Sequence, residues 1–160
     1  MDTQFLAEQV GQLLQQRGLS LGLAESCTGG LVAAYITNVA GASGYFLGGI
    51  VAYSVEVKYR LLGVSRRTLK SHGAVSAETA QEMARGARER LHVDVAVAIT
   101  GIAGPTGALP GKPVGLTFMA LAGPDSTLVR KYLWAGDRRA NRESSARAAL
   151  ELLAEYLEQH

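Results

Sequence analysis

The sequence predicts an α/β protein, a three-layer α/β/α sandwich with helices on both faces of a mixed, mostly parallel sheet. Helical patterns alternate with short apolar strands over most of the chain, which is typical of parallel sheets covered on both faces. Near the end, two strand patterns are separated only by Gly123-Pro124-Asp125-Ser126. So short a connection predicts a C-terminal antiparallel hairpin. The length of 160 residues fits a single domain over residues 1–160.

The first half of the chain is expected to contribute two strands and several helices. An apolar face that includes Leu6 and Val10 predicts a helix over residues 3–17, which Gly18 can end. The elements expected after it are a strand at 19–24, a helix at 29–38, a turn at 41–44, a buried strand that begins at Phe46, and short helices at 55–62 and 65–71.

The second half of the chain supplies the rest of the sheet. Ser76 can cap a helix over residues 77–91. The valine-rich run at 93–99 predicts the clearest strand, because it is apolar nearly throughout, as a strand buried on both faces must be. Strands at 114–122 and 127–134 form the hairpin, and a helix that opens at 136–142 closes the chain.

Composition limits the classes of partner and compartment. A formal charge of +2, with Lys and Arg scattered along the chain, predicts no nucleic-acid-binding surface. The single cysteine, Cys27, suits a reducing compartment and excludes an internal disulfide. We find no signal peptide and no apolar run of membrane-spanning length, and therefore expect a cytoplasmic protein without a membrane partner. The three histidines are far apart, so we expect no metal site. The sequence matches neither a P-loop nor the G-x-G-x-x-G motif, and we expect no cofactor.

The stretch at 24–30, Ala-Glu-Ser-Cys-Thr-Gly-Gly, organises the rest of the chain. An apolar run leads into it and a helical pattern leaves it, which is where α/β sheets present reactive groups at the carboxyl ends of their strands. Ser26, Cys27 and Thr28 bring hydroxyl and thiol groups to this turn, and Gly29 and Gly30 let the backbone approach a ligand closely. The alternative interpretation is a simple helix cap.

A serine–lysine pair is the chemistry that these residues favour. Lys58 falls near the start of the 55–62 helix, and Tyr53 ends the strand before it, so both can lie close to Ser26. A neutral lysine can take the proton of a serine hydroxyl, and backbone N–H groups around Thr28 to Gly30 can hold an oxyanion. A solvated surface lysine, or a triad that uses His72, are the alternatives.

Two further segments are candidates for binding a ligand. Thr100 and Gly101 open a glycine-rich loop at a strand end, which is either a structural turn or a backbone cradle beside Ser26. Arg138 and Arg142 lie four residues apart and therefore on one side of the last helix. They form either a solvated basic face or a clamp for a phosphate or carboxylate.

Five motifs in a fixed order resemble the CinA C-terminal domain family, the nicotinamide-nucleotide amidases, over about residues 5–158. The motifs are 24–30, Tyr53-Ser54 with Lys58, Gly-Ala-Val-Ser at 73–76, Thr-Gly-Ile-Ala-Gly-Pro at 100–105 and Gly-Asp-Arg at 136–138. The resemblance implies metal-free hydrolysis of nicotinamide mononucleotide to nicotinic acid mononucleotide and ammonia. Larger relatives carry an additional amino-terminal domain of the molybdopterin-binding type. The 160 residues leave no room for it, so we expect any pyrophosphatase activity of that domain to be absent.

The resemblance assigns roles to individual residues. It implies that Ser26 is the nucleophile and Lys58 the base, and that Tyr53 and Thr100 belong to the site. The family's arginine near the last helix corresponds to Arg138 or Arg142, which we expect to meet the nucleotide phosphate. The partner is therefore a small nucleotide, and we expect a homo-oligomer.

Two rival functions remain open at this point. Cys27 is adjacent to Ser26 and would be the nucleophile of a cysteine amidase, with Glu25 and Lys58 as helpers. Against this, a free cysteine is usually a small buried filler. The second rival is a non-catalytic nucleotide-binding module that keeps the phosphate site without turnover.

Overall fold

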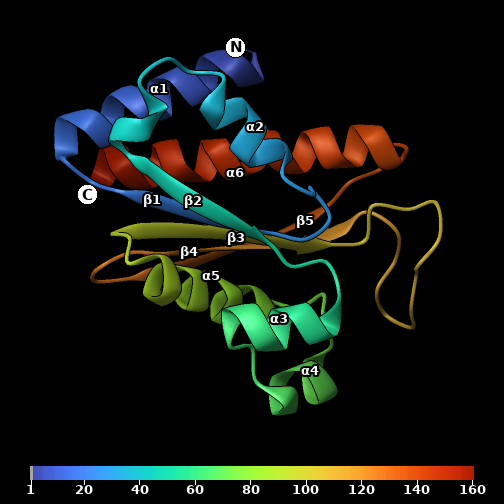
Figure 1. The fold of residues 1–160 in the computed structure, drawn as a ribbon. Coiled ribbons are helices and arrows are strands. Elements are labelled where there is room, and N and C mark those ends of the chain that lie inside the picture. The colour runs from blue at the N-terminus through green and yellow to red at the C-terminus, as the bar shows by residue number, and fades with distance from the viewer. Residues whose placement is uncertain (1) are drawn as a thin grey trace.

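The computed structural model describes residues 2–160 and contains one five-stranded sheet between two layers of helices (Figure 1). The strand order is β2-β1-β3-β4-β5. Strand β1 pairs in parallel with β2 and β3, whereas β4 runs antiparallel to both β3 and β5. Four strands therefore point the same way, and the predicted mixed, mostly parallel sheet is confirmed. The strands are β1 (Leu21–Glu25), β2 (Phe46–Val51), β3 (Val95–Gly101), β4 (Leu116–Ala122) and β5 (Thr127–Leu133).

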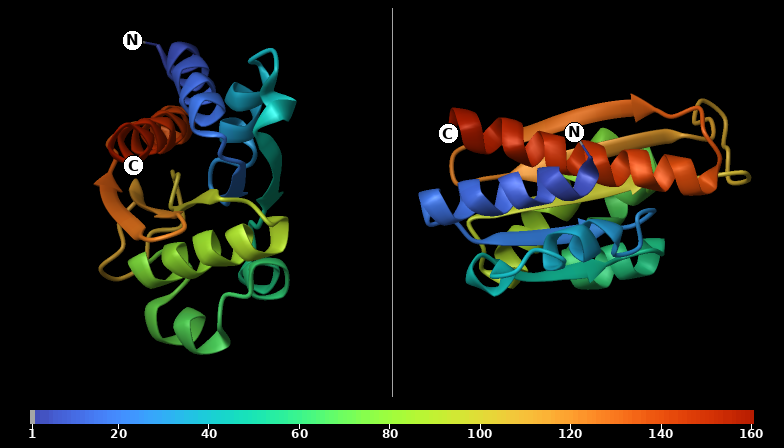
Figure 2. Two further views of the ribbon diagram at one scale, coloured as in Figure 1. Left: turned by 90° about the vertical axis from the view of Figure 1, so that its left-hand side faces the viewer. Right: turned by 90° about the horizontal axis from the view of Figure 1, so that it is seen from above.

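Helices cover both faces of this sheet, which confirms the predicted three-layer arrangement (Figures 1 and 2). One layer contains α1 (Thr3–Arg17), α2 (Leu31–Thr37) and α6 (Arg138–Gln159). The other contains α3 (Val55–Leu62), α4 (Arg66–His72) and α5 (Ala77–Leu91). A 3-10 turn, Ala42–Gly44, joins α2 to β2. No helix among residues 2–160 combines the length and apolar character needed to cross a membrane.

The two faces of the sheet carry side chains of different size. Successive strand residues point to opposite faces, and large side chains such as Leu23, Val97 and Leu121 face the layer of α1 and α6. The face toward α5 is built from small residues, which lets this helix approach the sheet closely. These residues are Ala24, Ala96, Ala98, Ala120 and Ala122.

The prediction that the strand beginning at Phe46 is buried is wrong. Strand β2 is an edge strand, and its residues alternate between half-buried and exposed.

The first strand also begins later than expected, at Leu21. The N–H of Leu19 donates to the Leu14 carbonyl and ends α1, while the Ser20 hydroxyl donates to Asp94 at 3.0 Å. Residues 19–20 therefore form the connection between α1 and β1 and are not part of the strand.

Side-chain caps set the helix starts near the functional end of the sheet. Ser54 accepts from the N–H of Val57 at the start of α3, and Ser76, as predicted, accepts from that of Thr79 at the start of α5. Each cap satisfies a backbone donor that the helix itself leaves unpaired.

Candidate functional site

The carboxyl ends of β1, β2 and β3 meet at one end of the sheet, where a cavity of about 140 Å³ opens. Ser26 follows β1 directly, Tyr53 and Lys58 follow β2, and Thr100 and Gly101 are the last residues of β3. All of these predicted site residues line the cavity. Its remaining wall is formed by Cys27, Ala74, Val75 and Ala103.

Ser26 and Lys58 are in direct hydrogen-bond contact. The Lys58 Nζ lies 2.9 Å from Ser26 Oγ and donates to the carbonyl oxygens of Ala52 and Tyr53, also at 2.9 Å. A neutral amine has two N–H bonds and one lone pair. With both hydrogens directed at the two carbonyls, the lone pair is left for the Ser26 hydroxyl proton, which is the arrangement that a general base requires.

Burial prepares Lys58 for this role. Only 1% of the residue is exposed, so the interpretation of Lys58 as a solvated surface lysine is wrong. Removal of the ammonium from water lowers the pKa of Lys58 from the ordinary value of 10.5 to about 8. With this pKa, a minor fraction of Lys58 is neutral near pH 7, and the neutral form predominates above about pH 8. Among the described residues no carboxylate contacts Nζ to stabilise its charged form.

The turn that carries Ser26 is held by a buried carboxylate. Glu25 is 1% exposed and accepts hydrogen bonds from the N–H groups of Gly30, Val32 and Ala33, at the start of α2. Ser26 itself donates its N–H to the Ile99 carbonyl of β3. Sequence reasoning considered Glu25 only as a helper for Cys27, and missed that the carboxylate docks α2 against the turn.

The expected oxyanion donors need correction. The N–H of Gly29 donates to the Ser26 carbonyl and that of Gly30 to Glu25, so neither is free. Over residues 2–160, the N–H groups of Cys27 and Thr28 have no oxygen acceptor. The free donors therefore lie one position closer to Ser26 than predicted. The Thr28 hydroxyl is also buried without a partner in the described part of the chain.

Arg142 braces this turn from α6. Its Nε donates to the Cys27 carbonyl at 3.0 Å, and its Nη2 donates to the Thr28 carbonyl at 2.8 Å. Because a trans peptide is planar, its C=O and N–H point in opposite directions. By fixing the Cys27 carbonyl, Arg142 therefore also fixes the direction of the free Thr28 N–H.

Arg138, at the start of α6, contacts the loop after β3 and the side chain of Tyr53. Its guanidinium donates to the Gly104 carbonyl at 2.8 Å and to the Tyr53 hydroxyl at 3.0 Å. A second cavity, of about 570 Å³, is lined by Arg138, Arg139 and Asp137 at the start of α6, and it shares Ala103 with the smaller one. Of the two arginines expected to meet a phosphate, Arg138 is thus the one that borders an open volume.

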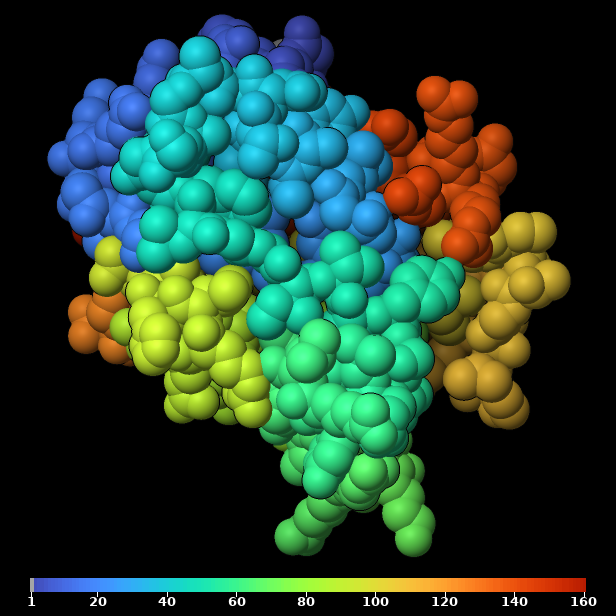
Figure 3. Space-filling view, viewed as in Figure 1, coloured from blue at the N-terminus to red at the C-terminus, as the bar shows by residue number. Residues whose placement is uncertain are grey.

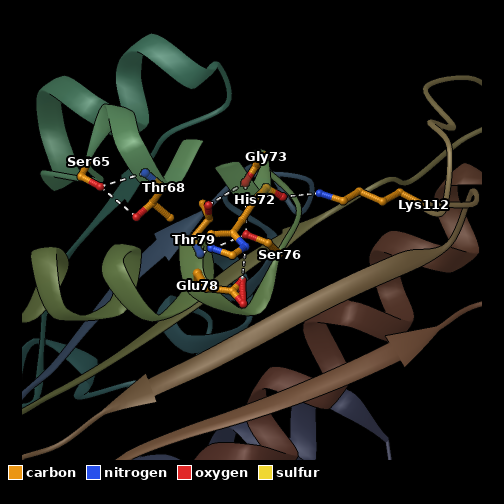
Figure 4. A network of polar contacts seen from close by, with 8 residues as sticks. All are labelled: Ser65, Thr68, His72, Gly73, Ser76, Glu78, Thr79 and Lys112. Atoms are coloured by element: carbon orange, nitrogen blue, oxygen red, sulfur yellow. Dashed lines mark hydrogen bonds and ion pairs between the residues drawn. The ribbon is translucent and has the colours of Figure 1, made fainter. Parts of the chain in front are cut away.

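Thr100 and the α4–α5 loop form part of the cavity wall. The Thr100 hydroxyl donates to the Ala74 carbonyl at 2.7 Å. Figure 4 shows how the rest of this loop is held: Ser76 and Thr79 donate to the Gly73 carbonyl, and Lys112 donates to that of His72. His72 pairs with Glu78 at 3.4 Å and not with Ser26. The predicted alternative of a triad that uses His72 is therefore wrong.

Cys27 lines the cavity but is poorly suited to act as a nucleophile. The residue is 6% exposed, and burial raises the pKa of its thiol to about 11. The reactive thiolate is therefore scarce near neutral pH. The amine of Lys58 contacts the hydroxyl of Ser26 and not the thiol of Cys27 among the described hydrogen bonds.

Comparisons with known proteins agree on one family. The model of the CinA C-terminal domain matches residues 3–157. A competence-damage inducible protein of Halothermothrix orenii is 48% identical over 157 residues, and a CinA-like protein of Geobacter sulfurreducens is 51% identical over 148. These matches cover 98% and 92% of this chain, which spans only 38% and 36% of the length of those two relatives.

Solved structures show the same relationship over the whole chain. A CinA superfamily protein from Klebsiella pneumoniae superposes with a TM-score of 0.97 at 34% identity, and all of each chain is covered. A competence/damage inducible protein from Agrobacterium tumefaciens gives a TM-score of 0.95 at 39% identity, with 99% of this chain and 96% of that chain covered. The motifs, the fold and these relatives together show that the chain belongs to the CinA C-terminal domain family.

Proposed function

We propose that this chain is a cytoplasmic amidohydrolase that converts nicotinamide mononucleotide and water to nicotinic acid mononucleotide and ammonia. The observation that carries the proposal is the buried Lys58 amine, 2.9 Å from the Ser26 hydroxyl and hydrogen-bonded to two backbone carbonyls. Such a pair activates a serine for attack on a carbonyl carbon. The family resemblance supplies the choice of amide.

The two adjoining cavities fit the two parts of this substrate. A cavity of roughly 150 Å³ accommodates a benzene ring, and the volume beside Ser26 is about 140 Å³. The pyridine ring and its carboxamide would occupy this space. The ribose phosphate would extend past Ala103 into the larger cavity, where Arg138 and Arg139 supply positive charge. The backbone N–H groups of these two arginines, at the start of α6, are also directed outward from the helix end.

The reaction proceeds through an acyl-enzyme. Neutral Lys58 takes the proton of Ser26 as Oγ attacks the carboxamide carbon, and the N–H of Cys27, with that of Thr28, stabilises the oxyanion. Protonated Lys58 returns the proton to the departing nitrogen, and ammonia leaves. Lys58 then takes a proton from a water that attacks the ester carbon, and returns this proton to Ser26 Oγ as the ester bond breaks, so that the carboxylic acid leaves and the Ser26 hydroxyl is restored. Tyr53 and Arg138, hydrogen-bonded to each other, flank the entrance.

Ammonia release tests this proposal and separates it from its rivals. We expect the parent to release ammonia and nicotinic acid mononucleotide in equal amounts. Ser26→Ala should lose at least a thousandfold in kcat while it keeps the fold and binds substrate. Cys27→Ser is the matched control and should retain substantial activity. No release by the parent would favour the non-catalytic binding module, whereas loss in Cys27→Ser with activity in Ser26→Ala would favour the cysteine amidase.

A further inference from the structure

An amide side chain is buried at the start of α6. Asn141 is 2% exposed, whereas the buried residues further along this helix are mostly alanine and leucine. A buried amide costs free energy unless its polar groups find partners. Here Nδ2 donates to the Ala103 carbonyl and Oδ1 accepts from the Gly136 N–H, each at 3.0 Å. Asn141 therefore joins the loop after β3 to the turn before α6, two segments that are far apart in the sequence.

The loop residue that Asn141 holds lies at the boundary between the two cavities. Ala103 lines both the smaller cavity beside Ser26 and the larger cavity beside Arg138. Gly136, the other partner of the amide, lines the larger cavity as well. Asn141 itself lines neither. The amide thus fixes the boundary from within the protein, without offering an atom to a ligand.

Arg138 supports the same loop through the next carbonyl. Its guanidinium donates to the Gly104 carbonyl at 2.8 Å, and Figure 3 shows the gold surface of this loop beside the orange-red surface at the start of α6. Arg138 is exposed, and its guanidinium has further N–H groups that can meet a phosphate. Because Asn141 is buried away from the cavities, its hold on Ala103 should persist when a ligand engages Arg138.

We propose that Asn141 is a positioning residue that keeps the two cavities in register, so that a substrate anchored by its phosphate presents its carboxamide to Ser26. This inference rests on the proposed function. Binding energy from a remote part of a substrate accelerates a reaction only when the site transmits it to the reacting atoms. A displacement of about 1 Å at those atoms can lower the rate about a hundredfold. The boundary at Ala103 is where such a displacement would arise.

Loss of this amide should change turnover and not affinity. Without Asn141 the phosphate still meets Arg138, so KM for nicotinamide mononucleotide should stay within about threefold while kcat falls about tenfold or more. Nicotinamide riboside has no phosphate to anchor, so its kcat/KM should change by less than about threefold. This pattern differs from a lost phosphate contact, which raises KM.

Steady-state ammonia release by Asn141→Ala tests the proposal, with Ser145→Ala as the matched control. Ser145 lies one turn further along α6, is 1% exposed, and accepts a hydrogen bond from Trp134 Nε1 at 2.9 Å, away from both cavities. Both variants should lose stability, but only Asn141→Ala should lose kcat selectively on the mononucleotide. An unchanged kcat, or equal losses on the mononucleotide and the riboside, would overturn the proposal.

Gly136→Ala approaches the same contact from the other side, and decides the matter if Asn141→Ala does not fold. A Cβ at Gly136 would lie 3.1 Å from Asn141 Oδ1 and 2.8 Å from the Cβ of Ala140, so it crowds the amide without removing it. The same selective loss of kcat is expected. A Gly136→Ala protein with parental kinetics on both substrates would contradict the positioning role.

Hydrogen exchange separates this inference from the proposed function, because it needs no turnover. The N–H of Ile102 donates to the Leu116 carbonyl, and that of Gly115 to the Ile102 carbonyl, across the base of the loop. Both amides should exchange about tenfold faster in Asn141→Ala and at the parental rate in Ser145→Ala. If the parent releases no ammonia, the proposed function is wrong. If exchange in Asn141→Ala is unchanged, Asn141 does not hold the loop, whatever the reaction.

Discussion

At the scale of single residues, the site depends on one amine that burial holds partly neutral. Lys58 is surrounded by two carbonyls, a hydroxyl and apolar residues, so its charged form gains hydrogen bonds but loses the solvation of water. The burial that lowers the pKa of Lys58 should therefore tie both the proposed activity and the stability of the fold to pH.

Activity should fall on the acid side as Lys58 becomes protonated. Because the neutral form is the base, kcat/KM should rise with pH through an apparent pKa of about 8. Lys58→Arg should be nearly inactive at every pH, since arginine supplies no neutral form. A His72→Ala/His92→Ala double variant is the control and should keep the acid limb. If the limb disappears with the histidines, the base is not Lys58.

The free energy of unfolding should also depend on the titration of Lys58. The folded-state pKa of Lys58, about 8, lies below the ordinary 10.5, so the unfolded chain binds more protons between these values and stability rises with pH there. Compared with Lys58→Met, the parent should gain about 1 kcal/mol in free energy of unfolding between pH 7 and 9. Urea titrations of both proteins at pH 7 and pH 9 measure this difference. The other titratable groups are common to the parent and to Lys58→Met, so their contributions cancel. If the stability of the two proteins responds equally to pH, Lys58 has the same pKa in the folded and the unfolded chain.

At the scale of elements, α6 carries two arginines with different tasks. Arg142 contacts two carbonyls of the Ser26 turn, whereas Arg138 borders the larger cavity. Their spacing of four residues places them on one side of the helix. Arg142 contacts the turn after β1, whereas Arg138 contacts the loop after β3 and the residue Tyr53 after β2.

Substitution of the two arginines should therefore separate binding from turnover. Arg138→Ala should raise KM for nicotinamide mononucleotide by about one to two powers of ten, because a hydrogen bond to a charged group contributes about 1.5–3 kcal/mol. Nicotinamide riboside, which lacks the phosphate, should lose little. Arg142→Ala should lower kcat for both substrates, and Arg142→Lys should not restore it, since one ammonium cannot reproduce the forked contact. Equal losses on both substrates for Arg138→Ala would contradict phosphate recognition.

At the scale of the whole molecule, the packing of helices within the layer of α3, α4 and α5 depends on a small residue. Gly86 of α5 packs against the backbone of α3, and a Cβ at this position would collide with the Leu62 carbonyl oxygen. Close contacts of this kind leave no room for adjustment in a well-packed interior.

Gly86→Ala should for this reason destabilise the protein. Overpacking costs about 1–3 kcal/mol, which outweighs the gain of about 1 kcal/mol from better helix propensity. Gly44→Ala is the control, because no atom lies within 4 Å of a Cβ there and its φ is not positive, so its effect should stay within about 0.5 kcal/mol. Thermal unfolding of both variants tests this prediction. A Gly86→Ala protein more stable than the parent would mean that α5 can move away from α3 to accommodate the added methyl group.

The sequence was sufficient for the alternation of elements and for the meeting of Ser26 with Lys58, because strand-end residues of parallel strands share one edge of a sheet. It was not sufficient for properties that depend on neighbours in space. Nothing in the pattern of β2 distinguishes an edge strand from a central one. The N–H groups of Gly29 and Gly30 appeared free until their acceptors, including Glu25, were located.

The alanine-lined face beneath α5 has a consequence for substrate scope. The loop that supplies Ala74 and Val75 to the cavity leads directly into α5, so the height of this helix above the sheet also sets the width of the cavity. Methyl groups of Ala96, Ala98 and Ala120 act as spacers of fixed thickness. The dimensions of this cavity are thus set partly by the core, so a variant meant to admit a bulkier ligand should change the thickness of the alanine layer as well as the residues that line the cavity.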